Sequence, residues 1–132
     1  MASVFTKIIN GEIPAYKIAE DENYIAILDA FPVVKGHTLV IPKKEVDKIY
    51  ELDEPTYTGL MLFARRVARA LEKAVPCIRV GVSVVGLDVH HVHVHLLPLN
   101  GPGDMNLNKE KPSFTPEEMQ AVADAVTSKL EK

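Results

Sequence analysis

The sequence has a single cysteine, Cys77, and no tryptophan. One cysteine excludes an intramolecular disulfide, so a disulfide-stabilised secreted scaffold is excluded and a reducing compartment fits the composition. An excess of basic residues is also absent, since 15 Lys and Arg stand against 18 Asp and Glu, for a formal net charge of −3. Non-specific binding to nucleic acid requires a strongly basic face, and we therefore expect no nucleic-acid partner.

Long apolar segments are absent too. No run approaches the roughly 20 residues of a membrane span, and no charged start with an apolar core follows Met1. We therefore expect no membrane association and a cytoplasmic location. The chain has 132 residues, of which 47% are hydrophobic and 25% charged, and these values are typical of one globular domain.

The hydrophobic pattern predicts a few short strands and two helices. Strand-like patterns cover residues 15–20, 24–28, 38–41, 79–84 and 91–97. A long middle helix is predicted from a cap at Asp53 to a stop at Pro76, and a C-terminal helix from a capping box formed by Thr115 and Glu118. Because this order is not a βαβ alternation, it predicts an α+β fold with a mainly antiparallel, roughly five-stranded sheet.

Two further segments carry specific expectations. Alternation along residues 79–84 predicts that Val80, Val82 and Val84 face the core. Residues 98–113 are rich in Pro, Gly and Asn, which predicts a long loop. A loop of that length inside a compact domain is often functional.

The histidines are concentrated in one short stretch. Four of the five fall between positions 90 and 95, and three of these, His91, His93 and His95, alternate with valines. Side chains alternate on a strand, so His91, His93 and His95 are expected on one face and the apolar residues between them on the other. Three aligned imidazoles need polar partners and add less apolar burial than Val or Ile would. The run therefore indicates a functional site more strongly than a structural face.

From the residues alone, three interpretations of this face stay open. It could be a structural face of hydrogen-bonded histidines. It could bind a metal, since two histidines one residue apart on a strand can share a zinc ion. Or one histidine attacks as a nucleophile while the others orient it and protonate the leaving group. An imidazole suits that role because its ordinary pKa of about 6.5 leaves it largely neutral at neutral pH.

Residues 91–97 match every position of the histidine triad (HIT) motif, His-φ-His-φ-His-φ-φ, in which φ is apolar. Residues 5–14, 28–32 and 36–43 resemble further segments of the HIT family in the same order, so the likeness covers roughly residues 3–100. The branch that the sequence resembles is the HINT-like one, the nucleoside phosphoramidate hydrolases. The resemblance implies one HIT domain over residues 1–132, with a C-terminal loop and helix in residues 98–132.

The resemblance implies a hydrolase that cleaves a purine nucleoside phosphoramidate or related nucleotide at its α-phosphate. His93 would attack phosphorus and form a covalent nucleotidyl-histidine, while the backbone carbonyl of His91 would hold the other ring nitrogen of His93 as a donor. His95 would contact the phosphate or the leaving atom, and His37 would complete the relay. The alternatives are a purine nucleotide-binding or sensing module with little turnover, and a dinucleoside polyphosphate hydrolase or nucleotidyltransferase.

The same resemblance implies a nucleotide site for a ligand such as AMP or an adenosine phosphoramidate. Asp29 would bind the ribose hydroxyls, although by itself it also fits a plain turn before Pro32. Apolar positions around the base would be Phe5, Ile8, Ile27 and Leu39. Positions near the phosphate would be Gly81, Ser83, Gly86, Asp88 and Val89. The resemblance also implies a homodimer whose sheets join, and no cofactor.

The sequence departs from the family at several of these places. Ser3, Thr6 and Glu45 stand where many relatives carry zinc ligands, so we expect no structural zinc. Gly81 and Asp88 stand where the branch often has Asn and Ser or Thr. Two unit charges about 4 Å apart interact by about 4 kcal/mol at an effective dielectric near 20, so an unpaired Asp88 facing the phosphate would oppose binding. We expect Asp88 to point away or be paired, leaving Ser83 or N–H groups near Gly86 for the phosphate.

Overall fold

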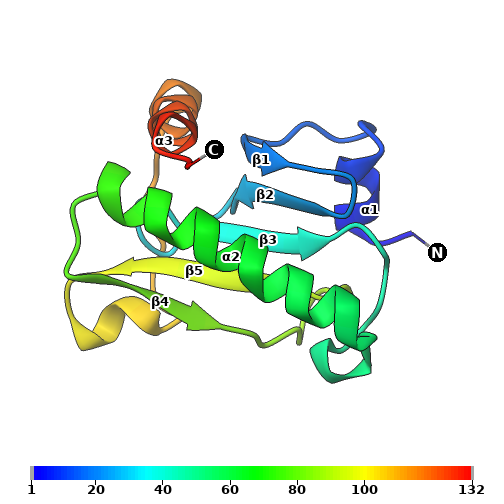
Figure 1. Cartoon of the computed structure of the whole chain (residues 1–132). Coiled ribbons are helices and arrows are strands. Elements are labelled where there is room, and N and C mark those ends of the chain that lie inside the picture. The colour runs from blue at the N-terminus through cyan, green and yellow to red at the C-terminus, as the bar shows by residue number, and fades with distance from the viewer. Residues whose placement is uncertain (1, 132) are drawn as a thin grey trace.

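The computed structural model describes residues 2–131, which form one antiparallel sheet and three α-helices (Figure 1). The strands stand in the order β1-β2-β3-β5-β4. Their bounds are β1 Lys17–Glu20, β2 Tyr24–Leu28, β3 Thr38–Pro42, β4 Arg79–Ser83 and β5 Val94–Leu99. The predicted α+β class and the roughly five-stranded antiparallel sheet are confirmed.

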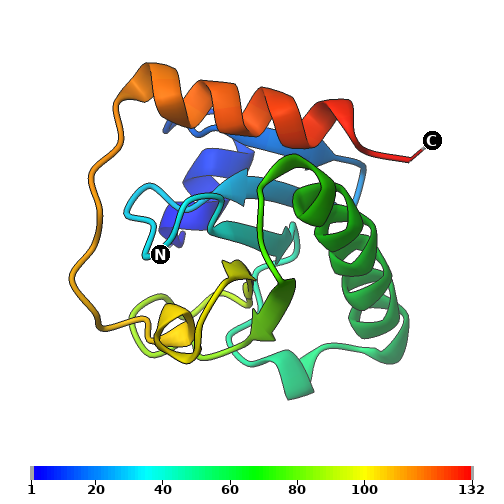
Figure 2. The same cartoon turned by 90° about the vertical axis from the view of Figure 1, so that its left-hand side faces the viewer.

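The helices lie on both faces of the sheet. The long middle helix is α2 (Glu54–Ala74), the C-terminal one is α3 (Pro116–Ser128), and the N-terminal segment forms a short helix, α1 (Val4–Ile9). Two short 3₁₀ turns, η1 (Ile49–Glu51) and η2 (Pro102–Met105), complete the elements. The turned view shows α2 on one side of the central strands and α1 on the other (Figure 2). No helix in the described part of the chain is both long enough and apolar enough to cross a membrane.

Both predicted helix starts are confirmed. The Asp53 side chain accepts a hydrogen bond of 2.8 Å from the N–H of Thr56, which satisfies one of the unpaired donors of the first turn of α2. At α3, Thr115 and Glu118 cap each other's N–H groups at 3.1 and 2.8 Å, as a capping box requires.

The two central strands carry apolar side chains to both faces. All residues of β2 and β3 are buried. One set packs against α2 and α3 in the larger core, with Ala26, Leu28 and Val40 among its members. The other set packs on the opposite face with Phe5 of α1 and comprises Ile25, Ile27, Leu39 and Ile41. The histidines of the triad lie beside this second, smaller apolar cluster.

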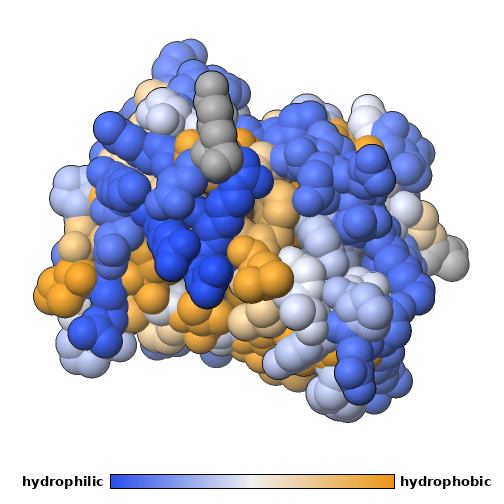
Figure 3. All heavy atoms as spheres, viewed as in Figure 1, coloured by the Kyte–Doolittle hydropathy of each residue, from blue (hydrophilic) through white to orange (hydrophobic). Residues whose placement is uncertain are grey.

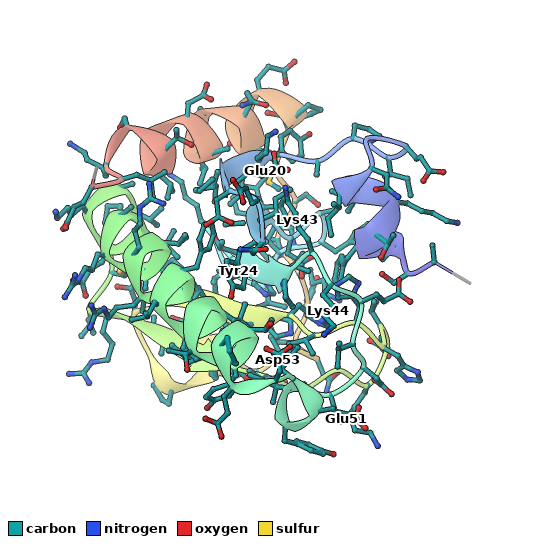
Figure 4. The ribbon with its side chains drawn as sticks, turned by 45° about the vertical axis from the view of Figure 1, so that its right-hand side comes forward. Glu20, Tyr24, Lys43, Lys44, Glu51 and Asp53 are labelled. Carbon is teal, nitrogen blue, oxygen red and sulfur yellow. The ribbon has the colours of Figure 1, made fainter. Side chains whose placement is uncertain are left out.

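The loop that follows β3 is held at two points. Lys43 pairs with Glu20 of β1 at 2.7 Å, and Lys44 pairs with Asp53, the cap of α2, at 3.3 Å. Figure 4 shows these pairs on either side of Tyr24. The Tyr24 hydroxyl donates to the carbonyl of Thr56 at 3.0 Å, so strand β2 is tied to the first turn of α2 as well. These contacts fix the course of the chain from Pro42 onward.

The expectation for residues 79–84 is wrong in part. Val80 packs against the larger core, but Val82 and Val84 are 52% and 40% exposed. The physical reason is position in the sheet: β4 is an edge strand, and it ends at Ser83, so Val84 lies beyond it. Alternation correctly predicts a strand, but it does not show how much of the strand's apolar face is covered by the rest of the protein.

The histidine run is also not entirely a strand. Strand β5 begins at Val94, so residues 91–93 precede the ladder with β3, which ends at the pair Val40–Val94. The predicted alternation nevertheless continues through them, because Val92 is buried in the larger core with Val94 and Leu96. Residues 98–113 are less of a loop than predicted, since β5 runs to Leu99 and η2 follows.

Candidate active site

Four histidines converge on the sheet face that carries the smaller apolar cluster. They are His37, His91, His93 and His95, and none exposes more than 7% of its surface. The ring of His93 lies 4.9 Å, centroid to centroid, from both the Phe5 ring and the His95 ring. His95 stands opposite Leu39 on β3 and Ser83 on β4. The structure thus brings together the three histidines of the run and adds His37, which precedes β3.

The tautomer of His93 follows from its hydrogen-bond partner. Nδ1 of His93 lies 2.7 Å from the carbonyl oxygen of His91. A carbonyl oxygen can only accept, so Nδ1 carries the hydrogen and Nε2 of a neutral ring presents a lone pair. Burial lowers the pKa of His93, which keeps the ring neutral at neutral pH.

A second chain of hydrogen bonds gives His95 the opposite arrangement. The N–H of Val33 donates to Nδ1 of His37 at 3.2 Å, so His37 carries its hydrogen on Nε2. Nε2 of His37 lies 2.9 Å from Nδ1 of His95, which must accept, and His95 therefore carries its hydrogen on Nε2. Burial, followed by the neighbouring His93 and His37, lowers the pKa of His95 to about 4. His95 thus has a donor at Nε2, and its ring lies 4.9 Å, centroid to centroid, from the ring of His93, which has a lone pair at Nε2.

Asp29 lies in a turn, as its position before Pro32 suggested, and it also lies beside His37. One oxygen, Oδ1, accepts a 2.9 Å hydrogen bond from the N–H of Phe31, as a turn aspartate does. The other, Oδ2, lies 3.6 Å from Nε2 of His37. Its negative charge raises the pKa of His37, but burial is the larger influence and the net pKa is lowered. Asp29 is therefore at the edge of the histidine group as well as in a turn.

The residues that the resemblance assigns to the base gather in one place. Phe5, Ile27 and Leu39 belong to the smaller apolar cluster, and Ile8 and Val89 pack against it. This cluster borders the histidines through the contact of Phe5 with His93. The structure thus brings the four base candidates together beside His93, and it places Val89, a phosphate candidate, against the same apolar cluster.

The candidates for the phosphate are more scattered. Ser83 lies directly across the ladder from His95, on the same face. Gly81 lies opposite Leu97, and a Cβ added there would meet Leu99 and Met105 at 2.6 Å, so this position is filled by protein atoms.

The loop before the triad supplies the remaining two phosphate candidates. Gly86 has a φ of +73°, a backbone conformation that favours glycine. Asp88 is exposed, and its charge is the smallest of the influences that raise the pKa of His93. The charge of Asp88 therefore acts on His93 from an exposed position.

Two groups of side chains raise the question of a metal. Ser3 Oγ lies 2.6 Å from Nδ1 of His91, and Thr6 Oγ1 lies 2.6 Å from Oε1 of Glu45. These residues do not fit zinc, because two neutral hydroxyls replace the thiolates or imidazoles that zinc prefers, and each hydroxyl is already engaged, Ser3 with His91 and Thr6 with Glu45.

Among residues 2–131, one other group of three metal-ligating types lies close together: Asp29, His37 and His95. In the structure His37 and His95 are hydrogen-bonded to each other, and Val33 occupies the second ring nitrogen of His37. The facing nitrogens of the two histidines are therefore already joined through a hydrogen. Sequence reasoning missed Val33, since its role is carried by a backbone N–H and no side-chain signal marks it.

Comparison with known proteins shows that this chain is similar to histidine triad proteins both in sequence and in structure. The HIT domain family model matches residues 10–101. The adenosine 5′-monophosphoramidase of Schizosaccharomyces pombe is 32% identical over 133 residues, which cover 98% of this chain and 99% of that protein. Among solved structures, a Hit-like protein from Bartonella henselae has a TM-score of 0.83 at 28% identity and covers 97% of this chain and 96% of its own. A zinc-bound histidine triad family protein from Mycobacterium smegmatis has a TM-score of 0.79 at 30% identity, with 97% and 95% covered.

The lowered pKa values predict a loss of stability in mild acid. The unfolded chain has histidines of ordinary pKa near 6.5, whereas the folded chain keeps His95 neutral down to about pH 4. Between these values the unfolded state binds more protons, so stability is fully present above about pH 6.5 and falls as the pH drops towards 4. The slope is at most about 1.4 kcal/mol per pH unit for each such histidine.

Urea unfolding followed by circular dichroism between pH 7 and pH 4.5 measures this slope. The variant His95→Asn should show a shallower dependence than the wild type, and His90→Asn, which alters an exposed histidine, should keep the wild-type slope. Equal slopes in all three proteins would contradict the assignment of a neutral, buried His95.

Proposed function

The chain belongs to the HIT domain family, and from this membership we propose that it is a hydrolase that cleaves a purine nucleotide at its α-phosphate. The proposal is supported by relatives named adenosine 5′-monophosphoramidase in two yeasts, at 32% and 35% identity. The substrate class that fits best is therefore an adenosine 5′-phosphoramidate, which releases AMP and an amine.

One observation carries the chemistry: of two neighbouring imidazoles, one has a free lone pair at Nε2 and the other has an N–H group at Nε2. His93 offers a lone pair at Nε2 because its Nδ1–H is bound by the His91 carbonyl, and His95 offers an N–H at Nε2 because its Nδ1 accepts from His37. A neutral imidazole with a free lone pair is a nucleophile, and a fixed N–H donor stabilises charge that develops on oxygen or nitrogen. Attack on phosphorus requires both.

The reaction then has two steps. Nε2 of His93 attacks the α-phosphorus, a bond forms between nitrogen and phosphorus, and the bond to the leaving amine breaks. His95 hydrogen-bonds the phosphate through its Nε2–H and gives that proton to the leaving amine as the bond breaks. Water then attacks the phosphorus of the nucleotidyl-histidine, the bond between phosphorus and Nε2 of His93 breaks, and one proton of the water returns to Nε2 of His95. The nucleoside monophosphate is released and both histidines are restored. The His91 carbonyl stabilises the positive charge on the His93 ring in the intermediate, as a carboxylate does in other triads.

The surroundings of the pair fit the rest of a nucleotide. Asp29 has a side chain that is 23% exposed and lies beside His37, where a carboxylate can accept from two ribose hydroxyls. The smaller apolar cluster with Phe5 offers an apolar surface for the base. Ser83, across the ladder from His95, is the hydroxyl that can donate to the phosphate.

We also propose that the protein is a homodimer joined through β4. This strand is an edge of the sheet, and an uncovered edge offers unpaired backbone groups to another strand. Apolar side chains on this strand, just before it and in the loop that follows it are exposed, with exposed fractions from 40% to 81%. They are Ile78, Val82, Val84, Val85 and Leu87. Figure 3 shows apolar surface along the lower side of the molecule, where β4 lies. Exposed apolar groups beside an open edge are typical of a surface that pairs with a second copy.

The nucleophile is tested by replacing His93. The variant His93→Asn keeps a polar side chain of similar size but cannot form a stable nucleotidyl adduct, so turnover of adenosine 5′-phosphoramidate should fall by at least about a thousandfold. Amine release measures the rate, and His90→Asn, at an exposed position outside the histidine group, should keep wild-type activity. Wild-type turnover in His93→Asn would reject the mechanism.

Two further experiments on the wild type, AMP binding and metal chelation, separate the alternatives. A sensing module would bind AMP in calorimetry but show no turnover of phosphoramidate or dinucleotide substrates in the wild type. A metal-dependent hydrolase would lose activity after exhaustive chelation, whereas the proposed mechanism predicts full activity after that treatment.

The dimer is tested at the edge strand. Replacing Val82 with Asp places two like charges at the proposed interface, so the variant should sediment as a monomer while its circular dichroism stays that of the wild type. The control variant Tyr50→Asp introduces the same charge at an exposed tyrosine on η1 and should remain dimeric. A monomeric wild type, or a Val82→Asp variant that still dimerises, would contradict the proposal.

A further inference from the structure

A network of four polar side chains joins the N-terminus of the chain to the histidine group. It consists of Ser3, Thr6, Glu45 and His91 and is called the Ser3 network below. Ser3 Oγ lies 2.6 Å from Nδ1 of His91 and 3.3 Å from Thr6 Oγ1, and Oε1 of Glu45 lies 4.0 Å from Nδ1 of His91. The network thus reaches the first histidine of the triad at its Nδ1 atom.

The direction of each hydrogen bond in the Ser3 network can be assigned. Nε2 of His91 lies 2.8 Å from the carbonyl oxygen of Pro42, which can only accept, so Nε2 carries the hydrogen. In a neutral ring Nδ1 must then accept, and its neighbour at hydrogen-bonding distance is the Ser3 hydroxyl. Ser3 therefore donates to His91.

Glu45 makes this assignment unambiguous. Its Oε1 accepts from the N–H of Ser3 at 2.8 Å and from the hydroxyl of Thr6 at 2.6 Å. These bonds lower the pKa of Glu45, with the Ser3 N–H as the largest influence, so its carboxyl group is ionised and can only accept. The Thr6 hydroxyl hydrogen is thus committed to Glu45. The Ser3 hydroxyl hydrogen is directed to Nδ1 of His91, at 2.6 Å, since Thr6 Oγ1 is the more distant acceptor at 3.3 Å.

His91 needs such a support because the sheet does not hold it. The ladder between β3 and β5 ends at Val40 and Val94, so residues 91–93 lie beyond it. Within this segment the N–H of Val92 is bound by the carbonyl of Val46 at 2.8 Å, and the His91 ring is bound at both nitrogens. The carbonyl of His91, which fixes the His93 tautomer, is held in place by these contacts.

We propose that Ser3 is a positioning residue for the reaction: its hydroxyl donates to His91, and the His91 backbone thereby holds His93 as a nucleophile. The resemblance implies zinc ligands in many relatives at the places of Ser3, Thr6 and Glu45, and these residues do not fit zinc. Hydrogen bonds from α1 and from the loop after β3 supply the constraint in this chain. That loop is itself anchored by Lys43 and Lys44 (Figure 4). The inference rests on the proposed function in that His93 is the nucleophile.

The test needs variants that separate this role from helix capping, because Ser3 Oγ also accepts from the N–H of Thr6 at the start of α1. Ser3→Gly removes the hydroxyl but keeps a residue that is well tolerated at a helix N-cap. Ser3→Thr keeps both the hydroxyl and the cap. Ser128→Ala, which removes an exposed hydroxyl at the end of α3, is the matched control.

Two measurements are made on the four proteins. The first is the kcat and KM for adenosine 5′-phosphoramidate. Ser3→Gly should lose about ten- to a hundredfold in kcat, as expected when a buried acceptor loses its donor, with KM changed less than about twofold. Ser3→Thr and Ser128→Ala should match the wild type. The second is the ¹⁵N NMR spectrum of the histidine rings without substrate, which distinguishes the two tautomers.

The wild type should show the Nε2–H tautomer at His91 and the Nδ1–H tautomer at His93, and Ser3→Gly should lose the single tautomer at both. An unchanged kcat or unchanged ring signals in Ser3→Gly would overturn the inference, as would a loss confined to KM. If the wild type does not turn over the substrate, the proposed function fails. The NMR spectra still decide whether Ser3 sets the two tautomers.

Discussion

The hydrogen bond between Nδ1 of His93 and the backbone carbonyl of His91 is the interaction on which the site depends. At 2.7 Å it is short, and its acceptor is a main-chain atom whose position is set by the fold. Because a carbonyl oxygen cannot donate, the bond allows His93 one neutral tautomer, with the lone pair on Nε2. A backbone acceptor carries no charge, so it controls the proton without raising the ring's pKa as strongly as a carboxylate would.

Burial has two effects on this group. It lowers the pKa values of His37, His93 and His95, which keeps these rings neutral, and it requires that every ring nitrogen shielded from water find a partner. No buried side-chain nitrogen or oxygen in the described part of the chain lacks a hydrogen-bond partner. Backbone groups of Val33, Pro42 and His91 provide three of those partners, so the reactive atoms are set largely by main-chain positions.

Much of the architecture could be predicted from local sequence signals. The caps at Asp53 and Thr115 predict helices α2 and α3, and the alternation of histidines with valines predicts their shared face. The exposure of Val82 could not be predicted, because alternation does not reveal which strand lies at a sheet edge.

At the site, sequence similarity points to the histidines and Asp29, but not to Val33 or the donor role of Ser3. Those depend on contacts between segments far apart in sequence: Ser3 and His91 are separated by 88 positions. The apolar residues that the resemblance assigns to the base have the same pattern as any core residue. Only their cluster with Phe5, whose ring contacts His91 and His93, distinguishes them.

The central claim is that His93 carries the nucleotide covalently. The most direct measurement is an acid-quenched reaction of the wild type with adenosine 5′-phosphoramidate, analysed by mass spectrometry of its peptides. The account predicts an adenylyl group on the peptide that contains residues 91–95, located by fragmentation on His93. Turnover without any adduct at early times, or an adduct on His91 or His95, would contradict it.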